Sequence, residues 1–226
     1  AVRSVEDDAE RCRLPVPHRS ATVSRMQFSP DGRYLAVTYQ HREGPSLRVW
    51  DTVQSTCWQL KDIPLHGNAS FDFDPTSTWM ALASGRSLTL WQLADGSQMR
   101  EIGLGGGAQE VQVGPSDGRI AVLLAGRRSL QVWQREAEQP RDFHLDLTVW
   151  AFTWHPLGGE LAVGGSDGSL QLLRLADPVR KVRAFDGHTG RIRGLHFAPQ
   201  GDLLVSQAWD GTTRLWEASS GQQLLR

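Results

Sequence analysis

The chain has little of what usually signals a disulfide framework or a membrane anchor. Its 226 residues include two cysteines, Cys12 and Cys57, which are too few for a disulfide scaffold. We interpret both as free thiols, which favours a reducing, cytoplasmic location. No apolar run approaches the ~18 residues of a membrane-spanning helix, so the sequence predicts no membrane segment. The first residues, AVRSVEDDAE, contain no initiator Met and no apolar signal region.

The sequence also lacks the residue spacings of metal, phosphate and hydrolase sites. No two of the seven histidines are spaced as H-x-x-x-H or H-E-x-x-H. The glycine-rich segment 103–108 does not end in Gly-Lys-Ser/Thr, and no G-x-S-x-G motif occurs. We therefore predict no metal, no cofactor and no catalytic residue. The net charge of −1 argues against nucleic acid as a partner. Basic residues do gather in 174–193, where we interpret those of an outer strand as protection against edge aggregation.

What the sequence does contain is a repeat. An alternating apolar run leads five times into a turn built on proline, at Pro30, Pro75, Pro115, Pro156 and Pro199. About twenty residues later a second apolar signal ends at Trp50, Trp91, Trp133, Leu173 and Trp216. Two signals that keep the same phase over five copies, with a period of about 40–45 residues, predict an all-β chain folded as a β-propeller of four-stranded antiparallel blades.

The repeats set the expected boundaries along 1–226. In the last repeat we expect strands at 195–199, 203–207, 212–216 and 222–226, with the Asp-Gly turn typical of a hairpin between the second and third. We expect earlier outer strands at 57–60, 98–102, 141–145 and 179–185. The five repeats then cover about 15–60, 61–102, 103–145, 146–185 and 186–226.

The N-terminal residues align on part of a repeat. Placing 2–14 on 47–59 superposes Cys12 on Cys57, so we expect 1–14 to be the end of a partial blade. This predicts that the chain is a C-terminal piece of a larger propeller, with further blades or another domain upstream. The alternative is that 1–14 is a degenerate linker and the five repeats close alone.

The residues of the fifth repeat resemble WD repeats. It contains Gly187-His188, then FAPQGD, Ser206, Trp209-Asp210-Gly211 and Trp216-Glu217. The resemblance implies a hydrogen-bonded structural network of His188, Ser206, Asp210 and Trp216. Three of these residues also have the types of a hydrolase triad, but the phase of the repeat already explains them. FSPDGRYLAV followed by LRVWD is also similar to WD repeats from bacteria.

The other repeats keep less of this pattern. The first offers Pro17-His18 for Gly-His, and the second has His66-Gly67 in reversed order. The third places Arg127 where the turn Asp would sit, and the fourth has Leu173 in place of Trp. We therefore expect the first four blades to depend more on apolar packing.

A group of Trp and Arg residues is the candidate partner-binding site. The resemblance to WD repeats implies that Trp150 and Trp209 lie at the top face of the propeller. Trp150 is expected just before an inner strand. The proposed Trp/Arg patch consists of Thr148, Trp150, Arg191, Arg193 and Trp209. Exposed Trp and Arg are common at binding hot spots. The alternative is that Trp209 merely covers Arg191 by cation–π stacking.

The sequence and its resemblance to WD repeats suggest three functions, which we compare. The first is a non-catalytic scaffold that binds a protein or peptide through the top face of the propeller. The second, taken from bacterial WD-repeat proteins, is the sensing or targeting end of a larger enzyme such as a Ser/Thr protein kinase. The third, a catalytic propeller, would need clustered carboxylates where the inner strands begin. Those positions instead hold Thr22/Ser24, Ala69, Gln109, Trp150 and Arg193.

Overall fold

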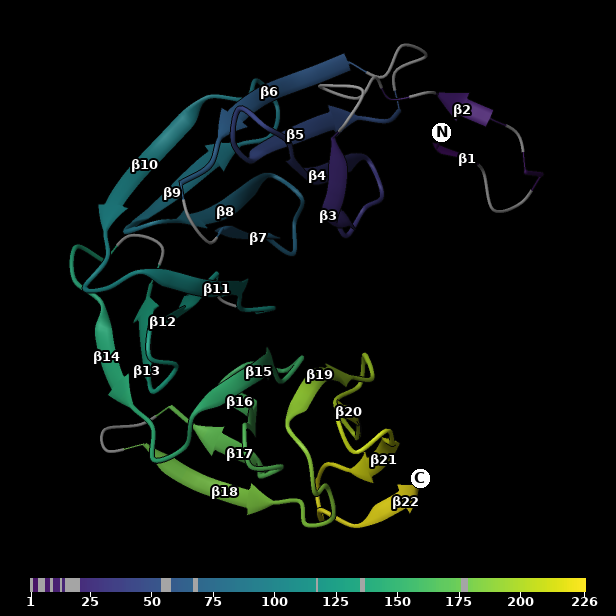
Figure 1. The fold of residues 1–226 in the computed structure, drawn as a ribbon, viewed down its shortest axis with the longest axis vertical. Coiled ribbons are helices and arrows are strands. Elements are labelled where there is room, and N and C mark those ends of the chain that lie inside the picture. The colour runs from purple at the N-terminus through teal and green to yellow at the C-terminus, as the bar shows by residue number, and fades with distance from the viewer. Residues whose placement is uncertain are drawn as a thin grey trace. The chain divides into compact units, whose positions relative to one another are not determined.

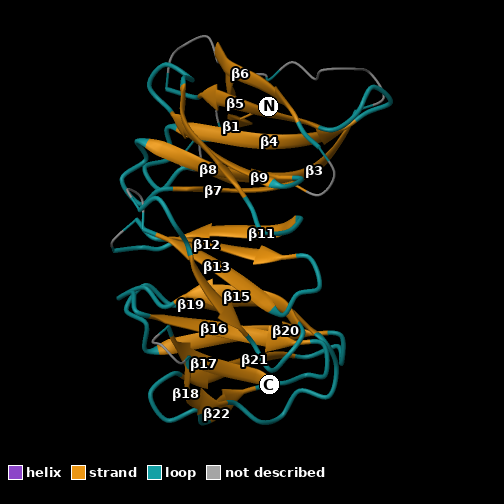
Figure 2. Cartoon of the chain, turned by 90° about the vertical axis from the view of Figure 1, so that its left-hand side faces the viewer, coloured by secondary structure: helices purple, strands orange, loops and turns teal. Residues whose placement is uncertain are grey.

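The computed structural model describes residues 2–3, 7–8, 10–12, 14, 21–53, 58–66, 69–116, 118–134, 137–175 and 179–226. All regular elements in these residues are strands, joined by turns and loops (Figure 2). The strands form one two-stranded sheet and five four-stranded antiparallel sheets. Within each four-stranded sheet, the strands lie side by side in chain order (Figure 1). The predicted all-β fold of four-stranded blades is confirmed.

The chain divides into two compact units, Ala1–Ala108 and Gln109–Arg226. The first unit starts with the two-stranded sheet of β1 (Val2–Arg3) and β2 (Glu10–Cys12), which is the partial blade. Its first full blade consists of β3 (Thr22–Phe28), β4 (Tyr34–Gln40), β5 (Ser46–Asp51) and β6 (Trp58–Pro64). Its second consists of β7 (Ala69–Phe73), β8 (Trp79–Ser84), β9 (Ser87–Gln92) and β10 (Gln98–Gly103).

The remaining three blades, apart from the first residue of β11, make up the second unit. The third blade consists of β11 (Ala108–Val113), β12 (Ile120–Leu124), β13 (Ser129–Trp133) and β14 (Arg141–His144). The fourth consists of β15 (Val149–Trp154), β16 (Glu160–Gly165), β17 (Leu170–Arg174) and β18 (Arg180–Ala184). The fifth consists of β19 (Ile192–Phe197), β20 (Leu203–Ala208), β21 (Thr213–Glu217) and β22 (Gln223–Leu225).

Two strands differ by three residues or more from their expected bounds, in each case because of hydrogen bonding. β19 begins three residues early and ends before Pro199, because the N–H of Ala198 donates to Leu203 O at 2.9 Å and closes the hairpin there. β6 extends to Pro64 instead of ending near residue 60, because it pairs with β5 along its whole length. The expectation for Cys57 and for the side chain of Cys12 lies outside the described residues.

Neighbouring blades are held together by apolar layers. In the first unit, Phe71 and Met80 of the second blade pack against Leu47 and Val49 of the first. In the second unit, Phe152 and Leu161 belong to the layer shared by the third and fourth blades. Ile192 and Trp216 belong to the layer shared by the fourth and fifth. Burial of these faces follows from the alternation of apolar residues along each strand.

Gly164 allows the fourth and fifth blades to approach closely. A Cβ atom at this position in β16 would lie 2.4 Å from Cγ2 and 2.5 Å from Cβ of Ile192 in β19. Since Ile192 is fully buried, it has no space into which to retreat. The missing side chain of Gly164 therefore sets the spacing of the β16–β19 contact, directly beside the residues of the Trp/Arg patch.

Candidate partner-binding site

Trp150 and Arg193 occupy equivalent irregularities at the start of two inner strands. In β15, Val149 pairs with Gly165 and Ala151 with Gly164, so Trp150 has no opposite residue. In β19, Ile192 pairs with Ala208 and Gly194 with Gln207, so Arg193 has none either. A bulge of this kind redirects a side chain out of the regular alternation. Trp150 was expected just before its inner strand, but it lies inside β15 because the ladder resumes around the bulge.

Two guanidinium groups lie over the ring of Trp150. The Cζ atom of Arg191 is 3.7 Å from the ring centroid, and the Cζ atom of Arg127 is 4.1 Å from it. Both distances are well inside the range of a cation–π contact. Arg127 comes from the turn between β12 and β13, so residues of three successive blades meet at this ring.

The contacts continue from Arg191 to the fifth blade's own turn. The Cζ atoms of Arg191 and Arg193 lie 5.7 and 5.3 Å from the ring centroid of Trp209. The turn is fixed below this ring, because the N–H of Trp209 donates to Arg191 O at 2.9 Å. The result is an alternating series of cations and aromatic rings that we call the Arg/Trp stack. In order along the series, its members are Arg127, Trp150, Arg191, Trp209 and Arg193.

Arg127 was not among the predicted site residues. The sequence signal was its position in the third repeat, at the place of the turn Asp. Its backbone has a φ of 58°, and its Nη2 donates to Gln109 Oε1 at 3.2 Å. Partial burial lowers the pKa of its guanidinium, while Glu110 acts in the opposite direction and Arg191 lowers the pKa further. Arg127 is therefore an inner member of the stack whose guanidinium is already hydrogen-bonded within the protein.

The outer end of the stack is open to solvent. The side chain of Trp209 is 67 % exposed, and Arg193 is also exposed. Within the described residues, neither Arg191 nor Arg193 forms a salt bridge with a carboxylate. Thr148, the fifth member of the predicted patch, is half-buried and outside the stack. Its contribution is a backbone one, since its carbonyl accepts the N–H of Ser166 at 2.9 Å.

The four residues of the expected network form a continuous hydrogen-bonded chain. Trp216 Nε1 donates to Ser206 Oγ at 2.7 Å, and Ser206 Oγ lies 2.7 Å from His188 Nε2. His188 Nδ1 lies 2.8 Å from Asp210 Oδ2. Because an ionised carboxylate only accepts, the imidazole proton belongs on Nδ1, and Nε2 accepts the Ser206 hydroxyl proton. Each member is thus both placed and satisfied by its neighbours.

Asp210 anchors this chain to the turn that carries Trp209. Burial acts to raise the pKa of the Asp210 carboxyl, but hydrogen bonds from Thr212, His188 and the Thr189 backbone outweigh it. The net effect holds the pKa well below its ordinary value. Thr212 Oγ1 and its backbone N–H donate to Asp210 Oδ1 at 2.7 and 2.9 Å. Since these bonds occupy both carboxylate oxygens, the turn has a fixed conformation beside the Arg/Trp stack.

The arrangement of Ser206 argues against use of these residues as a hydrolase triad. Ser206 is 0 % exposed, and its oxygen is engaged by both the indole of Trp216 and the imidazole of His188. A nucleophile needs access to a substrate carbon. In the described residues, no group of three or more His, Cys, Asp or Glu side chains is placed to hold a metal ion.

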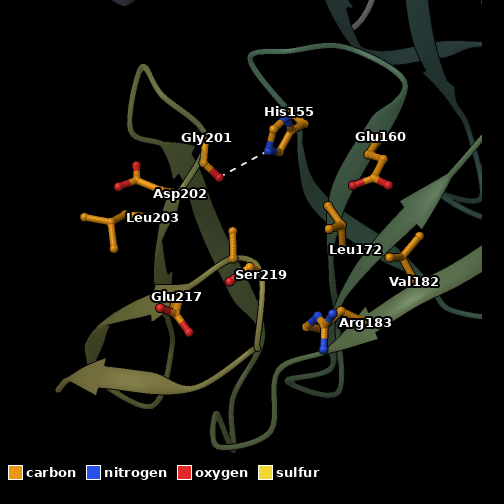
Figure 3. A pocket seen from close by; sticks show the side chains of 11 residues that line it. His155, Glu160, Leu172, Val182, Arg183, Gly201, Asp202, Leu203, Glu217 and Ser219 are labelled. Carbon is orange, nitrogen blue, oxygen red and sulfur yellow. Dashed lines mark hydrogen bonds between the residues drawn. The ribbon is translucent and has the colours of Figure 1, made fainter.

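A second feature of this unit is a hollow of about 270 Å³ between the fourth and fifth blades (Figure 3). His155 lies at one side, with its Nε2 3.1 Å from Gly201 O, and its ring packs edge-on against Phe197. Opposite, Nη1 of Arg183 donates to Ser220 O at 3.2 Å. Glu160 is paired with Arg174 at 2.7 Å. The contacts of His155 and Arg183 therefore join the two blades, whereas the Glu160–Arg174 pair lies within the fourth blade.

Comparison with known proteins identifies the repeats. Residues 11–51 and 179–217 match the family described as WD domain, G-beta repeat. The chain therefore carries WD40 repeats at these positions, and its four-stranded sheets are the blades of a β-propeller. None of the residues that the structure describes belongs to a helix with the length and apolar character needed to traverse a membrane.

Two proteins resemble the chain over different shares of its length. It is 25 % identical over 203 residues to the serine-threonine kinase receptor-associated protein of Homo sapiens, which covers 88 % of this chain and 56 % of that protein. It is 35 % identical over 79 residues to the probable cytosolic iron-sulfur protein assembly protein Ciao1 of Culex quinquefasciatus, covering 33 % of this chain and 23 % of that protein. The chain thus spans about half the length of the human relative.

A solved structure shares the fold. The β-propeller domain of Myceliophteria thermophila Cps50 (Swd1) matches with a TM-score of 0.72 and 18 % identity, over 88 % of this chain and 66 % of that one. At this identity the likeness concerns the fold alone. The comparisons give no support to the alternative of a propeller attached to a Ser/Thr protein kinase.

Proposed function

We propose that this chain is a non-catalytic scaffold that binds a protein or peptide partner through the exposed end of the Arg/Trp stack. The observation that carries the proposal is the position of Trp209, a large aromatic side chain that is 67 % exposed and rests on two arginines. Trp and Arg are the residues most enriched at binding hot spots. We also propose a cytoplasmic location, in keeping with the name of the mosquito relative.

Rigidity supports this assignment. Trp209 and Asp210 are adjacent in one turn, and the hydrogen bonds of Asp210 reach His188 and Thr212. The turn therefore loses little conformational entropy when a partner binds, because its backbone is already fixed in the free protein. The alternative role of Trp209, as a cover for Arg191, accounts for the stacking. That alternative gives no role to the part of the Trp209 ring that is exposed to solvent.

The test is quantitative affinity capture from an extract of cells that express the protein. The variants are Trp209→Ala and Arg193→Ala, both at exposed positions, where truncation leaves the fold intact. Leu157→Ala is the matched control for the first, since Leu157 is 74 % exposed in the β15–β16 turn. Arg180→Ala, on the outer strand β18, is the control for the second.

We expect proteins that wild type and both controls recover to be lost or reduced with the two site variants. Equal recovery with all four variants would place the partner site elsewhere on the chain. Melting temperatures of the variants, measured beside the capture, separate loss of binding from loss of fold.

A further inference from the structure

We propose that the partner segment bound at the Arg/Trp stack is acidic, and that Arg191 and Arg193 receive its carboxylates. This inference rests on the proposed function and adds the chemistry of the ligand. Its basis is a difference among the arginines of the stack. The three arginines differ in how far their N–H donors are already used by the protein.

Arg127 is the member whose donors are already used within the protein. Its guanidinium donates to Gln109 Oε1 at 3.2 Å and to Val149 O at 3.4 Å. Arg191 and Arg193 have no carboxylate partner in the described residues and are held by the faces of Trp150 and Trp209. A guanidinium that lies over a ring keeps its N–H donors at the edge of the group. These donors remain free for a carboxylate, to which Arg can donate in a bidentate manner.

Asp210 is the acid nearest in sequence to Trp209, and it does not compensate these charges. Its side chain is 8 % exposed, and its two oxygens accept hydrogen bonds from His188, Thr189 and Thr212. Those donors hold the pKa of its carboxyl below its ordinary value. The turn thus presents an aromatic ring to solvent while its own carboxylate is directed into the blade.

The same residue types also suit single-stranded nucleic acid, which stacks its bases on aromatic rings. The structure favours the peptide. Trp209 is the one exposed ring of the stack, whereas Trp150 is half-buried between two cations. A strand of nucleic acid needs a series of rings and a basic groove along its backbone. The net charge of −1 for the whole chain provides no such field.

The experiment measures fluorescence anisotropy with three labelled probes. The first is a short peptide of alternating Glu and Gly, the second is its Gln-for-Glu counterpart, and the third is a short oligothymidylate. Each is titrated with wild type, Arg193→Gln, Arg191→Gln and the control Arg180→Gln. Arg180 is exposed on β18, so the control removes one positive charge from the same unit without touching the stack.

We expect the Glu peptide to bind at least about tenfold more tightly than the Gln peptide, and added salt to weaken it. Arg193→Gln and Arg191→Gln should each weaken the Glu peptide by about five- to tenfold, because each removes a charge-assisted hydrogen bond. Arg180→Gln should leave the affinity within about twofold of wild type.

Three results would overturn the inference. Equal binding of the Glu and Gln peptides, or no binding of either, removes the acidic ligand. Equal weakening by Arg180→Gln and Arg193→Gln means that the peptide senses overall charge. If the oligothymidylate binds more tightly than the Glu peptide and this binding depends on Arg193, the surface is a nucleic-acid-binding site. Failure of the proposed function is seen separately, as partner capture that does not depend on Trp209.

Discussion

The indole N–H of Trp216 donates to the hydroxyl of Ser206, and both side chains are almost completely buried. Two other tryptophans at the same position of the repeat have no such arrangement. Trp50 and Trp133 are each 1 % exposed, and within the described residues their Nε1 atoms have no hydrogen-bond partner. In the third blade, the residue that corresponds to Ser206 is Val122, two positions after the residue paired with Trp133. The fifth blade is thus stabilised by polar bonds that the third lacks.

A hydroxyl introduced beside Trp133 should lower the free energy of unfolding less than one introduced where no indole is present. Val122→Thr adds a hydroxyl next to the unpaired indole of Trp133. Val163→Thr adds one at the equivalent position of the fourth blade, where Leu173 replaces Trp. Both valines are 0 % exposed. We expect Val163→Thr to lower the free energy of unfolding by about 1 kcal/mol more than Val122→Thr. Urea titrations of both variants check this, and equal costs would contradict it.

Loss of the Asp210 carboxylate should destabilise the fifth blade. Asp210→Ala leaves the imidazole of His188 and the hydroxyl of Thr212 without their acceptor, which should cost about 1–3 kcal/mol. The control is Asp167→Ala in the corresponding turn of the fourth blade. Within the part of the chain that the structure describes, the side chain of Asp167 accepts hydrogen bonds from Ser169 alone, and it is exposed, so its loss should cost less. Thermal unfolding distinguishes the two, and an unchanged melting temperature for Asp210→Ala would count against the network.

The depressed pKa of Asp210 predicts a stability difference that depends on pH. A carboxyl whose pKa is lower in the folded than in the unfolded chain stabilises the fold above its ordinary pKa of 3.8. That contribution is lost as the pH falls from there toward the folded pKa. The gap in unfolding free energy between wild type and Asp210→Asn should therefore be full above about pH 5 and shrink below about pH 4. Denaturant titrations across this range measure it; a constant gap would refute the assignment.

An alanine at position 164 should disturb the contact between the fourth and fifth blades. The new Cβ would overlap Ile192, so Gly164→Ala should cost about 1–3 kcal/mol through overpacking. Gly194→Ala is the matched control in β19, because a Cβ there meets nothing closer than 3.9 Å. Since Ile192 lies between Arg191 and Arg193, Gly164→Ala should also weaken binding of the acidic peptide. A stability equal to that of Gly194→Ala would show that the blades can move apart freely.

Much of this architecture was predictable because its signals are local. Strand positions follow from alternating apolar residues and from turns at residues such as Pro156 and Pro199, all within a few positions of one another. The residues His188, Ser206, Asp210 and Trp216 share a single blade, so a resemblance within one repeat was enough to bring them together. Strand ends were less accurate, because the end of β6 depends on how far its partner strand continues.

What the sequence could not supply are relationships between blades. Arg127 meets Trp150 only because the turn of one blade packs beside the inner strand of the next, and no spacing within a repeat encodes that contact. The bulge at Trp150 is similarly invisible, since the residues around it alternate like those of a regular strand. The contact between His155 and Gly201, which are 46 positions apart, likewise forms only because the fourth and fifth blades dock against each other.

The composition of the Arg/Trp stack links ligand binding to the cohesion of the unit. Arg127, Trp150 and Arg191 come from the third, fourth and fifth blades, so the surface exists only while these three sheets are docked. A ligand that binds this surface adds its binding free energy to that of docking, by an amount that grows with the logarithm of its concentration. Ligand bound to this surface should therefore slow hydrogen exchange and proteolysis along the contact between β16 and β19, beyond the residues that the ligand touches. The proposed partner site would in this sense also hold the three C-terminal blades together.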